Sequence, residues 1–464
     1  MKLPKWLFWW DSFVKELLWE PFWWMFLIAV ILFIPVLRVW WWFFVPIILF
    51  NHAVRLYRWW IAWDYVYANT KWVILELIPP KEILAPMKTM EDVFNTLWPI
   101  WDEADWKNIW IEGELDNAPY WFSFEIASIE GSVHFYARFM SAHRSLLESV
   151  LYAHYPEIEI REVSDYTKNV PQDIPNETWN LYAEDIQCLK APAYPIKTFE
   201  KFFEPQGERI SAEEKRVDPM VSLLESMSRL GLGEQYWAQF IIIPIADNDD
   251  PWKSKAKKII EKMSRRPVKK EKTLIQDVGE LLYHLIMGPT KEGSGDKASY
   301  KFLPRVMEDE GDDNELLLTP GEKEVLLAIE DKIKKPVFRV QMRGLYLAKR
   351  ENWNRSNQTL LRSYSSHFNT VHLNAMKHNG VTRTKVKYFM IERRLYLKKR
   401  RMFRNAVARF TSMFPNMQDQ VLILNTEEIA SIFHFPIKIT SLVSPTMARV
   451  ESKRGGPPPN LPLE

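Results

Sequence analysis

A long apolar stretch near the N-terminus constrains this chain more than any other part of its sequence. Between Pro21 and Phe50 the only charged side chain is that of Arg38. Moving one large apolar side chain out of water is favourable by about 1.5–3 kcal/mol, and about 20 apolar residues of helix cross a bilayer. The stretch therefore predicts a membrane anchor over residues 1–68, with a transmembrane segment at about 22–50.

Tryptophan is concentrated in the same region, in clusters spaced as they are at membrane–water interfaces. We expect interface anchors at Trp23, Trp24, Trp40, Trp41, Trp42, Trp59 and Trp60. Residues Trp6–Trp19 mix apolar and charged side chains, and they predict a separate amphipathic helix that lies in the plane of the lipid head groups. Membrane lipid is thus the first partner that the sequence predicts.

The way in which the anchor meets the membrane stays open. Pro35 and Pro46 would each kink or break a helix, so a kinked span and a re-entrant hairpin bent near Pro35 both fit the pattern. A cleavable signal peptide is disfavoured, because it has an apolar core of about 7–15 residues followed by a small-residue cleavage site. The stretch in this chain is longer, and no such site follows it.

The remainder of the chain is expected on the cytoplasmic side of the inner cell membrane. Its single cysteine, Cys188, can form no intramolecular disulfide, as is typical of cytoplasmic proteins. We interpret Cys188 as a buried structural thiol. The net charge of +2 predicts no partner by itself, so the distribution of charge along the chain matters more.

Residues 69–168 carry the pattern of an α+β domain. Strands are predicted at Trp72–Ile78, Trp121–Glu130, Val133–Phe139 and Ile158–Val163, with one helix after Pro86 and another after Ser141. The order β-α-β-β-α-β predicts a ferredoxin-like fold with strand order 4-1-3-2 and both helices on one face. The aromatic residues of the hairpin, Trp121, Phe122, Phe124, Phe135, Tyr136 and Phe139, favour core packing over the stacking of nucleic-acid bases.

Residues 169–385 predict a second α+β domain. Its expected strands are Glu234–Ala246 and Val337–Ala348, and its expected helices are Met220–Leu230, Pro251–Ser264, Lys272–Ile286, Pro320–Lys334 and Trp353–Phe368. The segments Leu181–Leu189 and Ala193–Phe203 precede them and carry no assignment to helix or strand. Residues 288–315 are polar and lack periodicity, which predicts a mobile insertion.

Residues 386–464 predict a basic helix, a short helix with Thr426 as its cap, and a proline-rich exit linker from Gly455 to Pro462. Between Lys377 and Arg409 there are twelve basic residues and one acid, Glu392. Candidate contacts to an anionic ligand, either DNA or lipid, are Arg393, Arg394, Lys398, Lys399, Arg400, Arg401 and Arg404. The alternative is a solvated helix that docks on the protein by its apolar stripe.

No catalytic, cofactor-binding or metal-binding motif emerges from the sequence. The phosphate-binding pattern G-x-x-x-x-G-K-[ST] does not occur, so the chain offers no site for ATP hydrolysis. The histidines have no ligand spacing suited to zinc, and Asp247–Asp250 lack the glycine and distal glutamate of a calcium loop. We therefore expect no enzymatic activity, no cofactor and no metal.

Three stretches together resemble a known family. They are KWVILELIPPKEILAPMKTMEDVFNTL (71–97), the hairpin and helix over 121–160, and ILNTEEIASIFHFP with the proline-rich end (423–462). These are similar to the region that precedes the motor in membrane-anchored conjugative-transfer, or type IV secretion, ATPases of the FtsK–HerA superfamily in candidate-phyla bacteria. In that family the proline-rich exit leads into the motor, which is missing from this chain.

The resemblance implies a non-catalytic, membrane-anchored scaffold that tethers or positions a motor during DNA transfer. It implies secretion ATPase or channel subunits as protein partners, DNA as a further candidate partner, and a homo-oligomer. One alternative is that the chain belongs to an ATPase whose motor lies in an absent C-terminal region or in a separate chain. Another is a membrane-bound module for anionic lipid or nucleic acid with no part in secretion.

Overall fold

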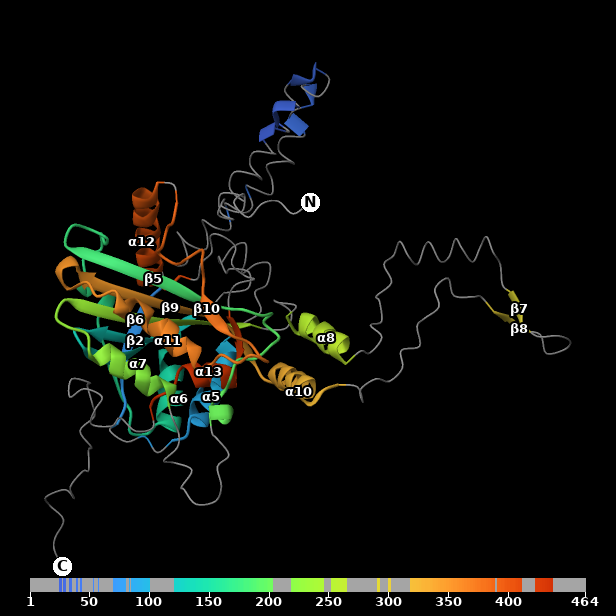
Figure 1. The fold of residues 1–464 in the computed structure, drawn as a ribbon, viewed down its shortest axis with the longest axis horizontal. Helices are drawn as coiled ribbons and strands as arrows, with labels where there is room; N and C mark the ends of the chain where they lie inside the picture. Colours follow the sequence, from blue (N-terminus) through green and yellow to red (C-terminus); the bar gives the residue numbers. More distant parts are fainter. Residues whose placement is uncertain are drawn as a thin grey trace, which may run out of the picture.

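The fold was analysed in a computed structural model of the chain (Figure 1). It describes residues 70–80, 83, 85–100, 121–202, 218–245, 252–264, 290–292, 299–301, 318–388, 390–410 and 422–436, with isolated positions between 25 and 57. The statements below concern these residues.

A nine-stranded sheet forms the centre of the molecule. Its order is β10-β5-β9-β6-β2-β3-β1-β4, with β11 paired to β9, and each of these pairings is antiparallel. The strands are β1 (Trp72–Ile78), β2 (Phe122–Ile129), β3 (Ser132–Met140), β4 (Glu159–Glu162), β5 (Trp179–Cys188), β6 (Glu234–Ile245), β9 (Val337–Lys349), β10 (Met376–His378) and β11 (Leu422–Asn425).

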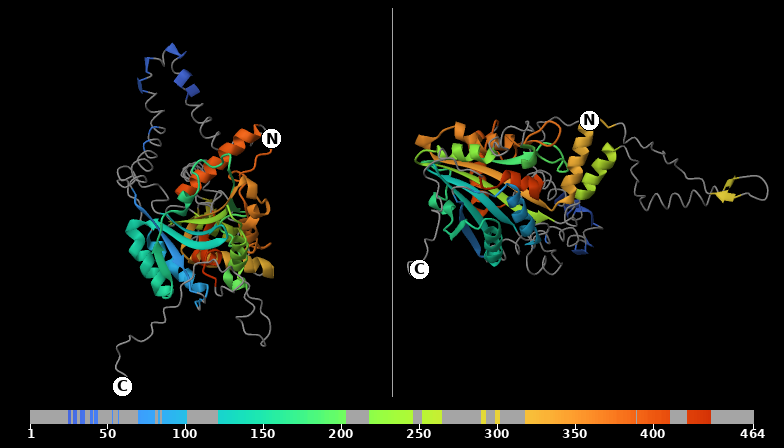
Figure 2. Two further views of the ribbon diagram at one scale, coloured as in Figure 1. Left: turned by 90° about the vertical axis from the view of Figure 1, so that its left-hand side faces the viewer. Right: turned by 90° about the horizontal axis from the view of Figure 1, so that it is seen from below.

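Helices cover both faces of this sheet (Figures 1 and 2). Their bounds are α5 (Lys88–Leu97), α6 (Arg144–His154), α7 (Pro219–Ser228), α8 (Trp252–Met263), α10 (Pro320–Lys334), α11 (Leu360–Ser366), α12 (Ile391–Ala408) and α13 (Thr426–Ile432). The larger core joins one face of the sheet to α5, α6, α7, α11 and α13, with Phe94 and Leu151 among its fully buried residues. On the opposite face Trp237 and the C-terminal half of α12 form a second core, which includes Phe403.

The predicted strand order 4-1-3-2 is confirmed, because β4, β1, β3 and β2 are neighbours in that sequence. Both helices of this unit, α5 and α6, also pack into the same core, as expected. The prediction of a separate four-stranded ferredoxin-like sheet is wrong. Strand β2 pairs along its length with β6, from Phe122 opposite Ile242 to Ile129 opposite Gln235, so the sheet continues into the region expected to form a second α+β unit.

The reason for this continuation lies in the burial of the two strands. Every residue of β6 is buried, and so is every residue of β2 except the last. The free edge of so deeply buried a strand would leave backbone N–H and C=O groups without partners, and pairing with β6 supplies those partners. The division of the chain into domains at residues 168 and 385 stays a prediction.

The expected transmembrane segment at 22–50 is also wrong. Among the described residues, no helix is both long enough and apolar enough to cross a membrane. Apolar composition and the clusters of tryptophan had predicted this span. Trp40 and Trp42 are described and exposed, with ring centroids 6.4 Å apart. The other five expected anchors, Trp23, Trp24, Trp41, Trp59 and Trp60, and the amphipathic helix at 6–19 lie outside the described residues.

Several smaller predictions have mixed outcomes. The insertion contains a two-stranded hairpin of β7 (Thr290–Glu292) and β8 (Ser299–Lys301), where no strand was expected, and its remaining residues lie outside the described part. The expected helix at 353–368 is shorter, because its first turn is the 3₁₀ segment η11 (Ser356–Thr359) and the α-helix α11 begins at Leu360.

The predicted helix at 272–286 and the exit linker at 455–462 lie outside the described residues.

The cap of the short C-terminal helix lies one residue earlier than predicted. The Asn425 side chain, not that of Thr426, accepts a hydrogen bond from the backbone N–H of Glu428, and the Glu428 carboxylate accepts one from the Asn425 backbone. Asn425 is extended (φ −81°, ψ 173°) and ends β11, so one residue terminates a strand and begins a helix.

Candidate anion-binding site

The basic helix α12 meets the protein with only one of its halves. Met402, Phe403 and Ala406 are buried against the sheet. Toward the other end Ile391, Tyr396 and Leu397 are exposed, and the helix extends beyond the body of the molecule (Figure 1). Docking by an apolar stripe, which the sequence offered as the alternative to anion binding, is therefore observed for the C-terminal half of α12. Binding of an anion by the helix stays a prediction.

The seven predicted anion contacts all lie on this helix but differ in their surroundings. Arg393 and Arg404 are exposed, whereas Arg394, Lys398, Lys399, Arg400 and Arg401 are partly buried. The Arg400 guanidinium donates a hydrogen bond to the backbone carbonyl of Asp173 over 3.2 Å. Of the seven, Lys399 alone lines a pocket that lies beside the helix and is described below.

A buried ion network fixes the docked end of α12. Arg409, which follows the helix, is fully buried and donates to both carboxylate oxygens of Glu125 and of Asp165, over 2.5–3.2 Å. Burial alone would raise the pKa of Glu125, but the charge and hydrogen bonds of Arg409, with hydrogen bonds from Ser123 and Tyr166, hold it below its usual value. Arg409 therefore has a structural role, and its guanidinium is not available to an external anion.

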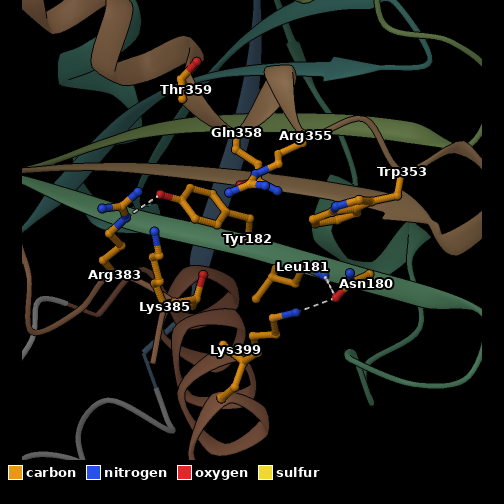
Figure 3. Close-up of a pocket in the computed structure, with 12 residues that line it drawn as sticks. Asn180, Leu181, Tyr182, Trp353, Arg355, Gln358, Thr359, Arg383, Lys385 and Lys399 are labelled. Carbon is orange, nitrogen blue, oxygen red and sulfur yellow. Dashed lines mark hydrogen bonds between the residues drawn. The ribbon is translucent and has the colours of Figure 1, made fainter. Parts of the chain in front are cut away.

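A pocket of about 380 Å³ lies beside α12, between that helix, β5 and the segment that follows β9 (Figure 3). Its lining residues are Asn180, Leu181, Tyr182, Trp353, Arg355, Gln358, Thr359, Arg383, Thr384, Lys385, Leu395 and Lys399. Four of these described residues are cationic and none is acidic. The volume lies within the range of about 300–1,000 Å³ that is typical of small-molecule sites.

Lys399 is a half-buried cation without a carboxylate partner among the described residues. Its Nζ donates a hydrogen bond to Oδ1 of Asn180 over 2.6 Å and lies 5.9 Å from the centroid of the Trp353 ring. Burial, together with the nearby charge of Arg350, lowers the pKa of Lys399 to about 8. A bound anion would supply the charge compensation that the protein itself does not give to this ammonium group.

Two further cations of the lining are available to a ligand. The side chains of Arg355 and Lys385 are exposed and have no hydrogen-bond or ion-pair partner in the described part of the chain. Figure 3 shows Arg355 and Lys385 extending toward the Tyr182 ring from opposite sides of β5. These two groups can approach an anion without breaking an existing contact.

The fourth lining cation, Arg383, is already held in place. Its Nε donates to the hydroxyl of Tyr182 over 2.8 Å and lies 3.8 Å from Oε2 of Glu184. The same carboxylate oxygen accepts a hydrogen bond from Arg362. Glu184 thus pairs with two guanidinium groups, which together carry one more positive charge than the carboxylate offsets.

An aromatic wall completes the pocket. The Trp353 indole packs against Tyr346, with ring centroids 4.9 Å apart, and it borders the cavity near Lys399 (Figure 3). A fixed aromatic surface with cations around it is the combination that binds flat, negatively charged molecules.

Sequence reasoning missed part of this site. It chose the cations of α12 but not Trp353 and Arg355, which directly follow β9. The run Arg350-Glu351-Asn352-Trp353-Asn354-Arg355 places a tryptophan between two arginines after a strand, and this local signal could have marked a binding loop. Nothing in the sequence indicated that this loop and Lys399 would line the same pocket next to β5.

Other candidate chemistry is weaker. Cys188 is partly buried, and burial raises its pKa to about 12, as expected of an unreactive thiol. No group of histidine, cysteine, aspartate or glutamate suited to a metal ion occurs among the described residues. Phe122, Phe124, Phe135 and Phe139 are buried in the larger core, which confirms the prediction of core packing for these rings.

Comparison with known proteins yields no relative: no protein-family model and no curated protein matches the sequence. The likeness to conjugative-transfer ATPases therefore stays a prediction.

Proposed function

We propose that this chain is a non-catalytic DNA-binding module that holds DNA for a motor supplied by another protein. The observation that carries the proposal is the pocket beside α12, whose described lining has four cations and no acid. The cationic helix that borders it adds exposed charge at Arg393 and Arg404.

Phosphate backbones are the ligands that such a surface suits best. DNA is a dense line of negative charge, and each basic side chain that neutralises a phosphate releases a bound counterion. Cations arranged along a helix about 27 Å long, at 1.5 Å per residue, can follow several successive phosphates. A helix that extends from the protein body also leaves room for a long ligand to pass.

The role of holding DNA for a motor rests on the family resemblance of the flanking segments. The sequence has no phosphate-binding G-x-x-x-x-G-K-[ST] motif, so the energy for translocation would come from a partner ATPase. A homo-oligomer and contact with secretion subunits remain part of this proposal.

The experiment is a salt titration of DNA binding. Binding of a fluorescent oligonucleotide by the full chain should weaken linearly on a plot of log K against log salt, with a slope set by the number of phosphate contacts. Arg393→Gln combined with Arg404→Gln should make the slope shallower by about 1–2. Arg229→Gln, which removes an exposed cation at the C-cap of the distant α7, is the matched control and should leave DNA binding unchanged. Absence of binding at low salt would refute the proposal.

A second candidate is an anionic lipid surface. Met390, Ile391 and Leu397 are exposed on or beside the same basic helix, and a basic amphipathic helix can lie on anionic head groups. Flotation with vesicles that contain anionic lipid separates the two candidates. Lipid binding that Leu397→Gln abolishes, without DNA binding, would favour the second.

A further inference from the structure

The pocket beside α12 differs from a simple cationic surface because it is concave and has an aromatic wall. A phosphate chain alone would need only exposed lysines and arginines. The combination of Trp353, Lys399 and a cavity of about 380 Å³ calls for a ligand that has both a flat ring and a negative charge. A nucleotide is the common biological molecule with this pair of features.

We propose that the pocket binds one nucleotide, with its base against Trp353 and its phosphate among Lys399, Lys385 and Arg355. The inference deepens the proposed function and rests on it, since it names the unit of the nucleic acid that enters the protein. The same chemistry is offered by a free mononucleotide and by an unpaired nucleotide within a strand.

The indole is well placed for the base. Tyr346 supports one part of the Trp353 ring at a centroid distance of 4.9 Å, which restrains the ring before a ligand arrives. Base–aromatic stacking contributes strongly to the binding of single strands and accepts every base, because each has a π face. A base inside a duplex is already stacked and paired, so it would first have to leave the helix.

The cations are well placed for the phosphate. The ammonium of Lys399 has only the Asn180 carboxamide as a hydrogen-bond acceptor among described residues, and the side chains of Arg355 and Lys385 have no partner there. A phosphate among them would form charge-assisted hydrogen bonds without displacing an internal carboxylate. Arg383 lies farther along β5, fixed by Tyr182 and Glu184, and adds positive potential without having to move.

Polar uncharged groups line the remaining space. The side chains of Gln358, Thr359 and Asn180 border the cavity. Carboxamides offer both donors and acceptors, so they can meet the edge of a base. This arrangement predicts modest preference among bases, and it predicts strong preference for an unpaired nucleotide over a duplex.

The test compares three ligands on the full chain: a single-stranded oligonucleotide, a duplex of the same sequence with closed hairpin ends, and AMP. Single strands should bind more tightly than the closed duplex. Trp353→Ala should weaken single-strand and AMP binding on the order of tenfold and leave duplex binding unchanged. Lys399→Gln should weaken both pocket ligands by a similar factor. Arg404→Gln, which changes an exposed α12 cation that does not line the pocket, should weaken oligonucleotide and duplex binding equally and leave AMP binding unchanged.

The outcomes separate this inference from the proposed function. If both forms of DNA bind but Trp353→Ala and Lys399→Gln affect single strand and duplex alike, the pocket assignment is wrong and DNA binding stands. If AMP binds through Trp353 while no DNA binds, the pocket stands and the DNA proposal falls. If no ligand binds, both fall. Trp353→Phe keeps the ring and should keep most of the binding, so it distinguishes lost stacking from a damaged fold.

Discussion

Arg409 and Glu125 are 284 positions apart in the sequence, yet Nε of the arginine lies 3.0 Å from Oε1 of the glutamate in the interior of the protein. Glu125 belongs to the central strand β2, and Arg409 follows the last turn of α12. This ion pair, with Asp165 as a second acid, links the C-terminal end of α12 to the sheet, beside the apolar contacts of Met402, Phe403 and Ala406. Lys399 lies on the same helix.

Removing the arginine should therefore undock α12. Arg409→Met leaves Glu125 and Asp165 as uncompensated carboxylates, and breaking a buried pair in this way costs about 3–5 kcal/mol. We expect a loss of this size in the free energy of unfolding, measured by urea denaturation. Glu125→Gln combined with Arg409→Met should be less damaging than the sum of the single changes. Additive losses would mean that the two residues do not act together.

Lys399 should lower stability at neutral pH. Its pKa is about 8 in the fold against about 10.4 in an unfolded chain, so the unfolded chain binds more protons between these values and stability rises with pH there. Lys399→Met should stabilise the protein at pH 7 by on the order of 1 kcal/mol, after allowance for solvent screening. The gain should disappear by about pH 10.5. An equal gain at pH 7 and above pH 10.5 would contradict this assignment.

His434 should contribute stability with the opposite dependence on pH. Its ring is buried and lies 2.9 Å from Oδ1 of Asp218. Burial alone would lower the pKa of His434, but the Asp218 charge and hydrogen bonds with Asp218, Ala430 and Ser431 outweigh it and raise the pKa. The contribution is complete below about pH 6.5, the unfolded pKa, and is lost as pH rises through the higher folded value.

Asp218→Asn tests this contribution without removing the N-cap of α7, because asparagine and aspartate cap helices about equally well. The substitution should destabilise the protein more at pH 6 than at pH 9, by about 1–3 kcal/mol in the difference between the two unfolding free energies. Equal destabilisation at both values would show that His434 is neutral throughout.

Gly344 should tolerate no side chain. A Cβ at this position of β9 would lie 2.7 Å from the Tyr236 hydroxyl and 3.0–3.1 Å from Leu361, both in the buried core under α11. We expect Gly344→Ala to cost about 1–3 kcal/mol of unfolding free energy. Gly321→Ala, at an open position in the first turn of α10, is the control and should be neutral or slightly stabilising. A similar stability for both variants would argue against close packing of α11.

Local patterns predicted most individual elements of the sheet. The strand at 72–78 and the helix at 320–334 agree with β1 and α10 residue for residue, because β-branched runs, prolines and capping residues act over short distances. Strands β10 and β11 were missed, since three or four residues carry too little periodicity. The pairing of β2 with β6 was not predicted, because the residues of one strand do not indicate which other strand will pair with it.

The candidate site was predicted only in part. Charge density identified the basic helix, and Lys399 is both a sequence-predicted contact and a pocket residue. Arg409 was counted only among the twelve basic residues of the segment, and the sequence did not show that it pairs with Glu125, since burial beside Glu125 depends on tertiary packing. Trp353 reaches the pocket only because β9 lies next to β5 in the sheet.

Cross-linking tests the central claim, that nucleic acid binds along α12 and at its pocket, most directly. A photoreactive single-stranded oligonucleotide would be cross-linked to the full chain at moderate salt, and the modified peptides would be identified by mass spectrometry. The account predicts cross-links in the segments 353–359 and 383–404, lost on addition of excess unlabelled strand. Cross-links confined to other segments, such as the lysine-rich α8 at 252–263, would contradict it.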